Sequence, residues 1–171
     1  ATGQLDLNNN DLIVDNGNLA AVTLLLKTGL DITGAYGGGP GITSTTFAMN
    51  PLQNTALGVA ANAELGYGTF SGQAVDANDI LVKYTYFGDA DLNGVVDTAT
   101  DFDLYITGLT SGGSQGGWLY GDFDYNGPVD SATDFDLYVT GLSSQSGALL
   151  TAGSSPIQAV PEPGSLALAA A

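Results

Sequence analysis

Three residue types that carry much of enzyme and metal chemistry are missing from the 171-residue chain, which has no cysteine, no histidine and no arginine. Without cysteine and histidine there is no Ser-His-Asp triad, no Cys-His pair, no zinc site of imidazole or thiolate ligands, and no disulfide framework. Without arginine, bidentate recognition of phosphate and carboxylate groups is lost as well. The sequence therefore rules out much of hydrolase and zinc-site chemistry.

Positive charge is almost as scarce. Lys27 and Lys83 stand against 18 carboxylates, which gives a formal net charge of -16 at pH 7. We expect no nucleic-acid partner, because binding to nucleic acid depends on clustered Lys and Arg that neutralise phosphates. An anionic membrane surface is disfavoured likewise. No run of about 20 apolar residues is present, so we expect no membrane span in the given chain.

The composition favours a packed core with many turns. Hydrophobic residues make up 44% of the chain, too many for a protein kept disordered by its charge. The 25 glycines, together with abundant Asn, Thr and Ser, favour turn-rich β structure over long helices.

The sequence changes character near residue 87. Residues 1–87 are poor in charge and carry strand-like patterns, whereas residues 88–142 hold ten of the sixteen aspartates. Residues 146–171 are rich in Pro, Ala and Ser. We therefore predict an α+β protein with a β-rich domain at 1–87, a duplicated region at 88–145 and a C-terminal tail at 146–171.

The first thirty residues predict a hairpin and a short helix. Residues 4–7 and 11–14 alternate apolar and polar residues on either side of a turn-prone Asn triplet, which predicts that the two segments pair. Asn18 is expected to cap a helix over residues 19–28, which Gly29 would close.

The rest of the β-rich part predicts a loop, an ambiguous segment and a strand. Residues 34–54, rich in Gly and Pro, are expected to form a long surface loop. Residues 56–65 are short and apolar, and fit a strand or a helix equally well. Residues 79–87 give the strongest strand pattern, from which Lys83 is expected to point to solvent.

Two blocks in the duplicated region repeat each other. Residues 88–105 read GDADLNGVVDTATDFDLY, and residues 121–138, which start 33 positions later, read GDFDYNGPVDSATDFDLY. Such self-similarity indicates a duplicated structural unit.

Both blocks match the ligand pattern of an EF-hand-type calcium loop. Such a loop supplies oxygen ligands from positions 1, 3, 5, 7 and 9, turns at a glycine in position 6 and closes with a carboxylate at position 12. Position 7 contributes only its backbone carbonyl, so a proline is tolerable there. We therefore predict two Ca²⁺ sites in which the metal is structural. The predicted ligands ahead of the closing position are Asp89, Asp91, Asn93, Val95 and Asp97 in the first loop, and Asp122, Asp124, Asn126, Pro128 and Asp130 in the second.

The closing ligand departs from the EF-hand pattern in the same way in both loops. Position 12 is Thr100 or Thr133, and the carboxylate falls one place later, at Asp101 or Asp134. We assign these two aspartates as closing ligands, because a shared one-residue insertion can be absorbed as a bulge. The alternative is that they cap the helices that follow.

A short helix is predicted after each loop, with an apolar stripe at i, i+3, i+4 and i+7. Gly108 and Gly141 are expected to end these helices early. The aromatic residues of the stripes can form a small core between the repeats or, alternatively, present a surface to a receptor. The stripes are Phe102, Tyr105, Ile106 and Leu109 in the first repeat, and Phe135, Tyr138, Val139 and Leu142 in the second.

These blocks resemble type I dockerin repeats, in which duplicated calcium loops are each followed by one helix. The VPEP sequence at residues 160–163 resembles the motif of the PEP-CTERM sorting signal of exported bacterial proteins, without the membrane helix and basic cluster that follow it there. A first residue other than Met is what removal of a signal peptide leaves, and equally what a shortened chain shows. Together the resemblances imply calcium binding and an extracellular location at a bacterial cell surface, but no activity.

No set of residues identifies a catalytic site. A glycosidase-type pair of aspartates stays open as an alternative, but nothing in the sequence singles one out. We therefore expect a non-catalytic structural subunit that assembles with copies of itself, by adding residues 2–7 or 154–160 to the sheet edge of a neighbour. The alternative is a dockerin-type adaptor that binds a cohesin-like receptor through its two helices.

Overall fold

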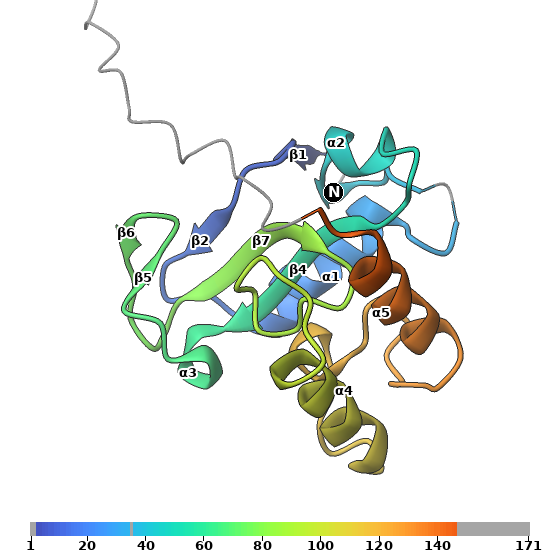
Figure 1. Cartoon of the computed structure of the whole chain (residues 1–171). Coiled ribbons are helices and arrows are strands. Elements are labelled where there is room, and N and C mark those ends of the chain that lie inside the picture. The colour runs from blue at the N-terminus through green and yellow to red at the C-terminus, as the bar shows by residue number, and fades with distance from the viewer. Residues whose placement is uncertain (1–2, 35, 147–171) are drawn as a thin grey trace, which may run out of the picture.

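The structure, a computed structural model, describes residues 3–34 and 36–146 and is a mixed α+β fold (Figure 1). The tail predicted at 146–171 lies outside the described residues from position 147 onward. In chain order the elements are β1 (Gln4–Asp6), β2 (Leu12–Val14), α1 (Leu19–Leu30), β3 (Gly41–Thr43), α2 (Thr45–Ala48), β4 (Thr55–Ala61), α3 (Asn62–Leu65), β5 (Thr69–Phe70), β6 (Gln73–Ala74), β7 (Ile80–Tyr86), α4 (Thr100–Thr110), the 3₁₀ helix η1 (Trp118–Tyr120) and α5 (Thr133–Ser144).

A three-stranded antiparallel sheet in the order β2-β7-β4 forms the centre of the fold. The strand predicted at 79–87 is confirmed as β7, the middle strand, in which all residues except Lys83 are buried. The ambiguous segment 56–65 divides into strand β4 and the single turn α3. Strand β4 pairs with β7 along its whole length, from Thr55 opposite Tyr86 to Ala61 opposite Ile80.

The predicted hairpin of residues 4–7 and 11–14 is wrong. The Asn triplet does form a turn, closed by the Asn10 N–H donating to the Leu7 carbonyl at 2.8 Å. The two strands nevertheless diverge, because β1 pairs in parallel with β3 and β2 pairs with β7. A strand of three residues gains more from a buried partner elsewhere in the fold than from its neighbour in sequence.

Helix α1 begins where the sequence predicted and ends later. The Asn18 side chain accepts a hydrogen bond from the Ala21 N–H at 2.9 Å, which confirms the N-cap. Gly29 does not end the helix. It lies within α1, where a Cβ would stand 2.0 Å from the Ile42 carbonyl oxygen, so its role is to let the helix pack closely on β3.

The predicted surface loop over residues 34–54 is wrong in part, because it contains β3 and α2. Ile42 and Phe47 from this segment are buried in the core. The Ser44 side chain caps α2 by accepting from the Phe47 N–H at 2.9 Å. Packing against α1 therefore stabilises regular structure in this segment, although its glycines predict a loop.

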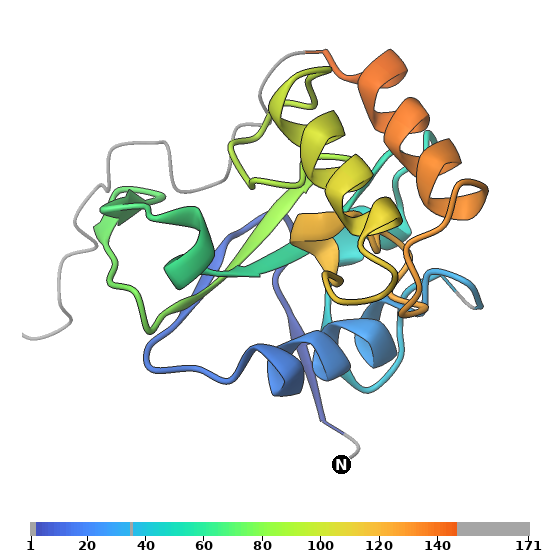
Figure 2. The same cartoon turned by 90° about the horizontal axis from the view of Figure 1, so that it is seen from below.

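Both halves of the chain contribute to one hydrophobic core in the described part of the molecule. Helix α1 lies on one side of the central sheet, and α4 and α5 lie on the other (Figure 2). Trp118 of η1 packs against β4 at Gly58, where a Cβ would stand 2.5 Å from the indole nitrogen. The change in composition near residue 87 is therefore not matched by a separate core on each side of it.

The expected exposure of Lys83 is wrong. Its side chain is only 12% exposed, and its Nζ lies 3.3 Å from Asp11 Oδ2. The ammonium group also lies over the ring of Phe70, 5.3 Å from the ring centroid. An acidic partner just before β2 and an aromatic ring over the sheet cover this position, which the strand pattern alone places on the outside.

Among the described residues, no helix has both the length and the apolar character needed to span a membrane.

Candidate metal centres

Two clusters of three carboxylates lie in the duplicated region. In each cluster, one oxygen from each carboxylate lies within 4.8 Å of those from the other two, so that both clusters could hold a metal ion. Five of the six aspartates are buried, and the sixth, Asp91, is partly buried. The clusters are Asp89, Asp91 and Asp101 in the first loop, and Asp122, Asp124 and Asp134 in the second.

The first cluster starts directly after the central strand. Asp89 follows the end of β7 by three residues, and its side chain accepts hydrogen bonds from the Thr85 hydroxyl and from the Gly94 N–H, the latter at 2.9 Å. Gly94 has a φ of 94°, a left-handed conformation that glycine adopts readily, so the loop can fold back over the carboxylate. The strand and this turn together fix Asp89 at the base of the loop.

The carboxylates at position 13 close both loops, while Thr100 and Thr133 at position 12 stay exposed at the surface. Asp101 accepts from the Ala90 N–H and the Asp97 N–H, each at 2.8 Å, and so ties the beginning of the loop to its end. Asp134 does the same with Phe123 and Asp130. The alternative that Asp101 and Asp134 act as N-caps is wrong, because α4 and α5 have already begun at the preceding residue.

Four further predicted ligands have other local roles in the loops. Asp97 and Asp130 lie outside the two clusters. The Oδ1 of each accepts, at 2.7–2.8 Å, from the backbone N–H groups of the first residue of the following helix and of the residue before it. Asn93 and Asn126 donate from their side chains to the position-3 carboxylates, at 3.0 and 2.8 Å. The carboxylates at position 9, not those at position 13, thus accept hydrogen bonds from the N-termini of the two helices.

The carbonyl ligands predicted at Val95 and Pro128 stay predictions. Both residues lie in the exposed part of their loops, and the Val95 side chain is 37% exposed.

Burial and mutual repulsion raise the affinity of the clusters for protons. Burial raises the pKa of Asp101 to about 7 and that of Asp134 to about 7, and neighbouring carboxylates add to both shifts. The pKa of Asp89 lies well above its usual range, chiefly because of burial and against the hydrogen bond from Thr85. Burial also raises the pKa of Asp122. A cation bound in either cluster would remove this cost, because it neutralises charges that the protein has taken out of water.

Each helix packs on the loop of the other repeat. The Tyr105 hydroxyl donates to the Asp130 carbonyl at 3.0 Å, and the Tyr138 hydroxyl donates to the Asp97 carbonyl at 2.9 Å. The rings of Tyr105 and Tyr138 stack with their centroids 6.2 Å apart. The two repeats are therefore interlocked with pseudo-two-fold symmetry: the helix of each repeat contacts the loop of the other.

The prediction that Gly108 and Gly141 end the helices is wrong, since both helices continue for two or three more residues. A Cβ at Gly108 would stand 1.9 Å from the Tyr120 carbonyl oxygen, and one at Gly141 would stand 1.7 Å from that of Phe87. The two carbonyls lie just ahead of the two loops, so these glycines let each helix touch the base of the other repeat's loop.

The sequence did not predict the contacts that hold the loops on the sheet. The Trp118 indole donates to the Asp89 carbonyl at 2.7 Å, and the Tyr67 hydroxyl donates to that of Asp91 at 2.8 Å. In the second loop, the Tyr125 hydroxyl donates to the Leu57 carbonyl of β4 at 2.6 Å. The one available signal was the large side chain at position 4 of each loop, Leu92 and Tyr125, both buried and both at positive φ.

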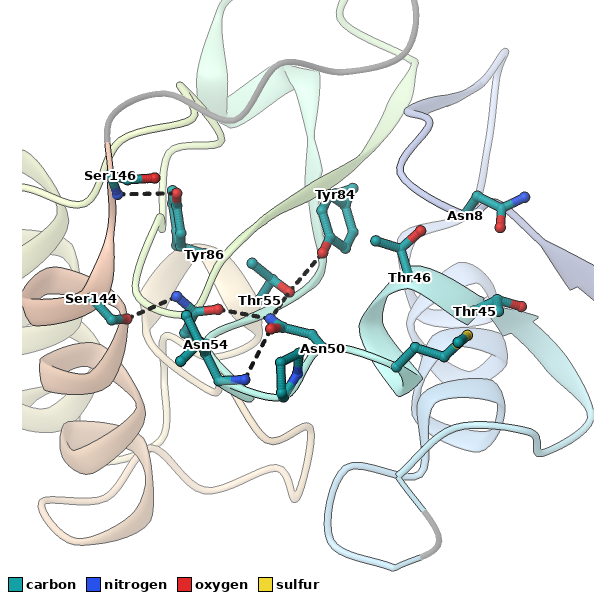
Figure 3. A pocket seen from close by; sticks show the side chains of 13 residues that line it. Asn8, Thr45, Thr46, Asn50, Asn54, Thr55, Tyr84, Tyr86, Ser144 and Ser146 are labelled. Carbon is teal, nitrogen blue, oxygen red and sulfur yellow. Dashed lines mark hydrogen bonds between the residues drawn. The ribbon is translucent and has the colours of Figure 1, made fainter.

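A separate hollow of about 580 Å³ lies where the end of α5 meets α2 and β4 (Figure 3). Its polar side chains bond to one another, with Asn50 donating to Asn54 at 2.7 Å and Asn54 to the Ser144 hydroxyl at 2.9 Å. Thr55 and Tyr84 share a further hydrogen bond of 2.8 Å. No Asp, Glu or Lys is among the residues that line it. Uncharged side chains around the hollow therefore form hydrogen bonds that connect α5 to the first half of the chain.

Comparison of the chain with models of protein families, with curated proteins and with solved structures found no match.

Proposed function

We propose that this chain is a non-catalytic, calcium-stabilised protein exported to the bacterial cell surface, where it acts as a structural subunit. One observation carries the proposal: two equivalent carboxylate clusters, each in a loop whose position-9 carbonyl accepts a hydrogen bond from the helix of the other repeat. An arrangement of this kind couples ion binding in either loop to the packing of the whole repeat region.

The donor set favours calcium among the common metal ions. Each cluster offers only oxygen ligands, which suit a hard cation, and the described chain contains no imidazole or thiolate that would favour zinc or copper. Three carboxylates, with the side chain of position 5 and the carbonyl of position 7 near them in sequence, approach the six to eight oxygens that Ca²⁺ prefers. Extracellular modules of this kind bind Ca²⁺ at about 10⁻⁴ to 10⁻³ M, which fits a protein outside the cell.

A structural role fits the burial of the ligands. Asp89, Asp101 and Asp134 have no exposed surface, and their carboxylates are engaged by backbone N–H groups of their own loops. An ion held there would stabilise the loops, whereas a catalytic ion needs a coordination position open to substrate. The residues that line the hollow in Figure 3 include no Asp, Glu or Lys.

Assembly with copies of itself is proposed through the N-terminal strand. Strand β1 has all three of its residues exposed, and in the described chain it pairs on one side only, with β3. Its other edge can accept a strand from a second molecule. The second segment expected to take part, residues 154–160, lies outside the described residues.

A dockerin-type adaptor that binds a cohesin-like receptor is the second candidate, and one observation favours it. Phe135 and Val139, one turn apart on α5, are 38% and 40% exposed. Their counterparts on the other helix, Phe102 and Ile106, are half-buried. The repeats therefore differ in the apolar surface that they offer to a receptor, while Tyr105 and Tyr138 serve as core.

Light scattering coupled to size exclusion, with negative-stain images of the same samples, tests the proposal in millimolar Ca²⁺ and in EGTA. Filaments or large oligomers that dissociate on chelation are expected for the structural subunit. A monomer that calcium stabilises would move the assignment to the adaptor. Identical behaviour and identical stability in the two buffers would contradict both.

A further inference from the structure

The residue that follows α5 makes two hydrogen bonds to the first loop. The Val96 N–H donates to Oε1 of Gln145 at 2.9 Å, and Nε2 of Gln145 donates to the Val96 carbonyl at 2.6 Å. A residue on a paired antiparallel strand would make the same two bonds with Val96. The Gln145 side chain can make both because its amide carries an acceptor oxygen and a donor NH₂ group side by side. Gln145 therefore takes the place of a strand beside the loop.

Contacts of the backbone hold Gln145 in this position. It is the first residue after α5, and its own N–H donates to the Gly141 carbonyl at 3.0 Å. The N–H of the next residue, Ser146, donates to the hydroxyl of Tyr86, the last residue of β7, at 3.2 Å. Val96 is only 2% exposed, so its bonds to Gln145 are largely sheltered from competing water.

The bond to the Val96 N–H also fixes the carbonyl of Val95. The two groups belong to one planar trans peptide group, in which the carbonyl and the N–H point in opposite directions. Val95 stands at position 7, where an EF-hand-type loop supplies a backbone carbonyl as ligand. Because its N–H is held toward Gln145, this peptide group turns the Val95 carbonyl away from Gln145. The orientation of a predicted ligand is therefore set by a residue outside the loop.

The second loop has no equivalent of Gln145. The two repeats are offset by 33 positions, so the residue that corresponds to Gln145 is Gly112. Glycine has no side chain that could bond to Val129, the residue at position 8 of the second loop. Pro128 at position 7 has a ring that fixes its own φ, but the ring does not fix the peptide group that follows.

We propose that Gln145 is a positioning residue for calcium in the first loop, where it holds the Val95–Val96 peptide group so that the Val95 carbonyl serves as a ligand. This inference rests on the proposed function, because it requires that the loops bind Ca²⁺. In the second loop the corresponding peptide group must be ordered when the ion binds, which costs affinity. The first site therefore binds Ca²⁺ more tightly than the second and is filled first.

A calcium titration of the full chain, followed in ¹⁵N–¹H spectra, tests this assignment. The amides of Gly94 and Gly127, at position 6 of the two loops, report the two sites separately. In the unmodified chain the Gly94 signal should saturate at lower Ca²⁺. Gln145→Met keeps a side chain of similar length without the two hydrogen bonds, and should weaken binding in the first loop about tenfold and in the second less than about twofold. Gln115→Met, at an exposed glutamine, is the matched control and should change neither affinity.

The ¹³C signal of the Val95 carbonyl gives a readout that general destabilisation would not move. Coordination of this carbonyl should shift its signal at saturating Ca²⁺, and Gln145→Met should lose most of that shift. Gln145→Glu keeps an oxygen that can accept from the Val96 N–H, and should retain the shift even if Gln145→Met fails to fold. Equal weakening of the two loops in Gln145→Met, or a Val95 signal that calcium does not shift in the unmodified chain, would overturn the assignment.

Failure of this inference is distinguishable from failure of the proposed function. If neither Gly94 nor Gly127 responds to Ca²⁺ in the unmodified chain, the calcium sites are wrong and the role of Gln145 is wrong with them. If both respond and Gln145→Met leaves the affinity of the first loop unchanged, only the role of Gln145 is overturned.

Discussion

The two acidic loops have nearly the same sequence but are attached to the fold in different ways. The first continues directly from the central strand, and Thr85, Tyr67 and Trp118 all donate to its first residues. The second follows η1 and reaches the sheet through the hydroxyl of Tyr125. Gly127 and Pro128 leave its far side exposed. Both loops contribute buried side chains to the core, but the first has three donors at its start, whereas the second is attached through the Tyr125 hydroxyl and its contacts with the first repeat.

Because of this difference, we expect an ion to have a different effect on stability in each loop. An ion in the first loop would neutralise Asp89, whose burial is complete, and would stabilise the end of β7. An ion in the second loop would likewise neutralise buried carboxylates, but there Lys27 already offsets part of the charge on Asp122. We therefore expect the first site to control global unfolding and the second to control local opening.

The largest expected effect comes from the two helix glycines that connect the repeats. Gly141→Ala would place a methyl group 1.7 Å from the Phe87 carbonyl oxygen, so α5 must move away from the base of the first loop. We expect a loss of about 3 kcal/mol or more in the free energy of unfolding, measured by urea denaturation in Ca²⁺.

Gly108→Ala should have a similar cost but should weaken calcium binding in the second loop, since its methyl group meets Tyr120. Gly116→Ala, where no heavy atom lies within 4 Å of the added methyl group, is the control. If each glycine affected only the loop of its own repeat, the interlocked arrangement would be refuted.

The next effect is the pH dependence of the calcium-free protein. Asp101 and Asp134 have pKa values raised to about 7 in the folded state by burial, while in the unfolded chain they titrate near the ordinary value of 3.8. Between about pH 4 and pH 7 the folded state keeps protons that the unfolded state has released. The free energy of unfolding should therefore fall as pH rises through this window and level off above it.

Calcium should reverse this trend, because bound carboxylates are deprotonated and metal competes with protons. Urea midpoints measured from pH 4.5 to 8, in EGTA and in Ca²⁺, give both slopes. A calcium-free stability that rises with pH over the same window would be inconsistent with buried, protonated clusters.

Replacing one closing carboxylate at a time by an amide should distinguish the contributions of the two loops to stability. At a calcium concentration ten times Kd, one site contributes about 1.4 kcal/mol to the free energy of unfolding. Asp101→Asn should lower the global midpoint by the whole of such a contribution, and Asp134→Asn should lower it by less. Differential scanning calorimetry with Asp103→Asn as the exposed control measures this. Equal effects of the two variants would remove the distinction between the loops.

The smallest expected effect is the loss of one reciprocal hydrogen bond. Tyr105→Phe and Tyr138→Phe remove the hydroxyls that donate to Asp130 and Asp97, and each should cost about 1 kcal/mol. Tyr120→Phe, whose hydroxyl contacts only Glu64 at an exposed position, should stay within about 0.5 kcal/mol. A double variant that costs more or less than the sum would measure the coupling between the repeats.

Local patterns predicted well where the decisive contacts are local. The Asn18 cap, the strand before the first loop and the acidic loop pattern all depend on residues within about a dozen positions of one another. The position-13 carboxylates also follow from the sequence, because both loops carry the same insertion and the same acidic residue beyond it.

Patterns failed where a distant partner decides the conformation. Gly29, Gly108 and Gly141 look like helix ends but are close-packing positions, and a sequence does not show the carbonyl oxygen that faces each one. The hairpin failed for the same reason, since β1 found its partner 37 positions away, at β3. The sequence also could not predict that each helix packs on the loop of the other repeat, because each helix could equally pack on its own loop.

Thermal unfolding of the full chain in Ca²⁺, in Mg²⁺ and in EGTA tests the central claim most directly. At calcium ten times Kd, the first loop should raise the midpoint over that in EGTA by about 3 to 6 °C, and the second should add less. Mg²⁺, which demands a tighter octahedral site, should give a smaller rise than Ca²⁺. A midpoint that is the same in all three buffers would show that the paired carboxylate clusters are not calcium sites.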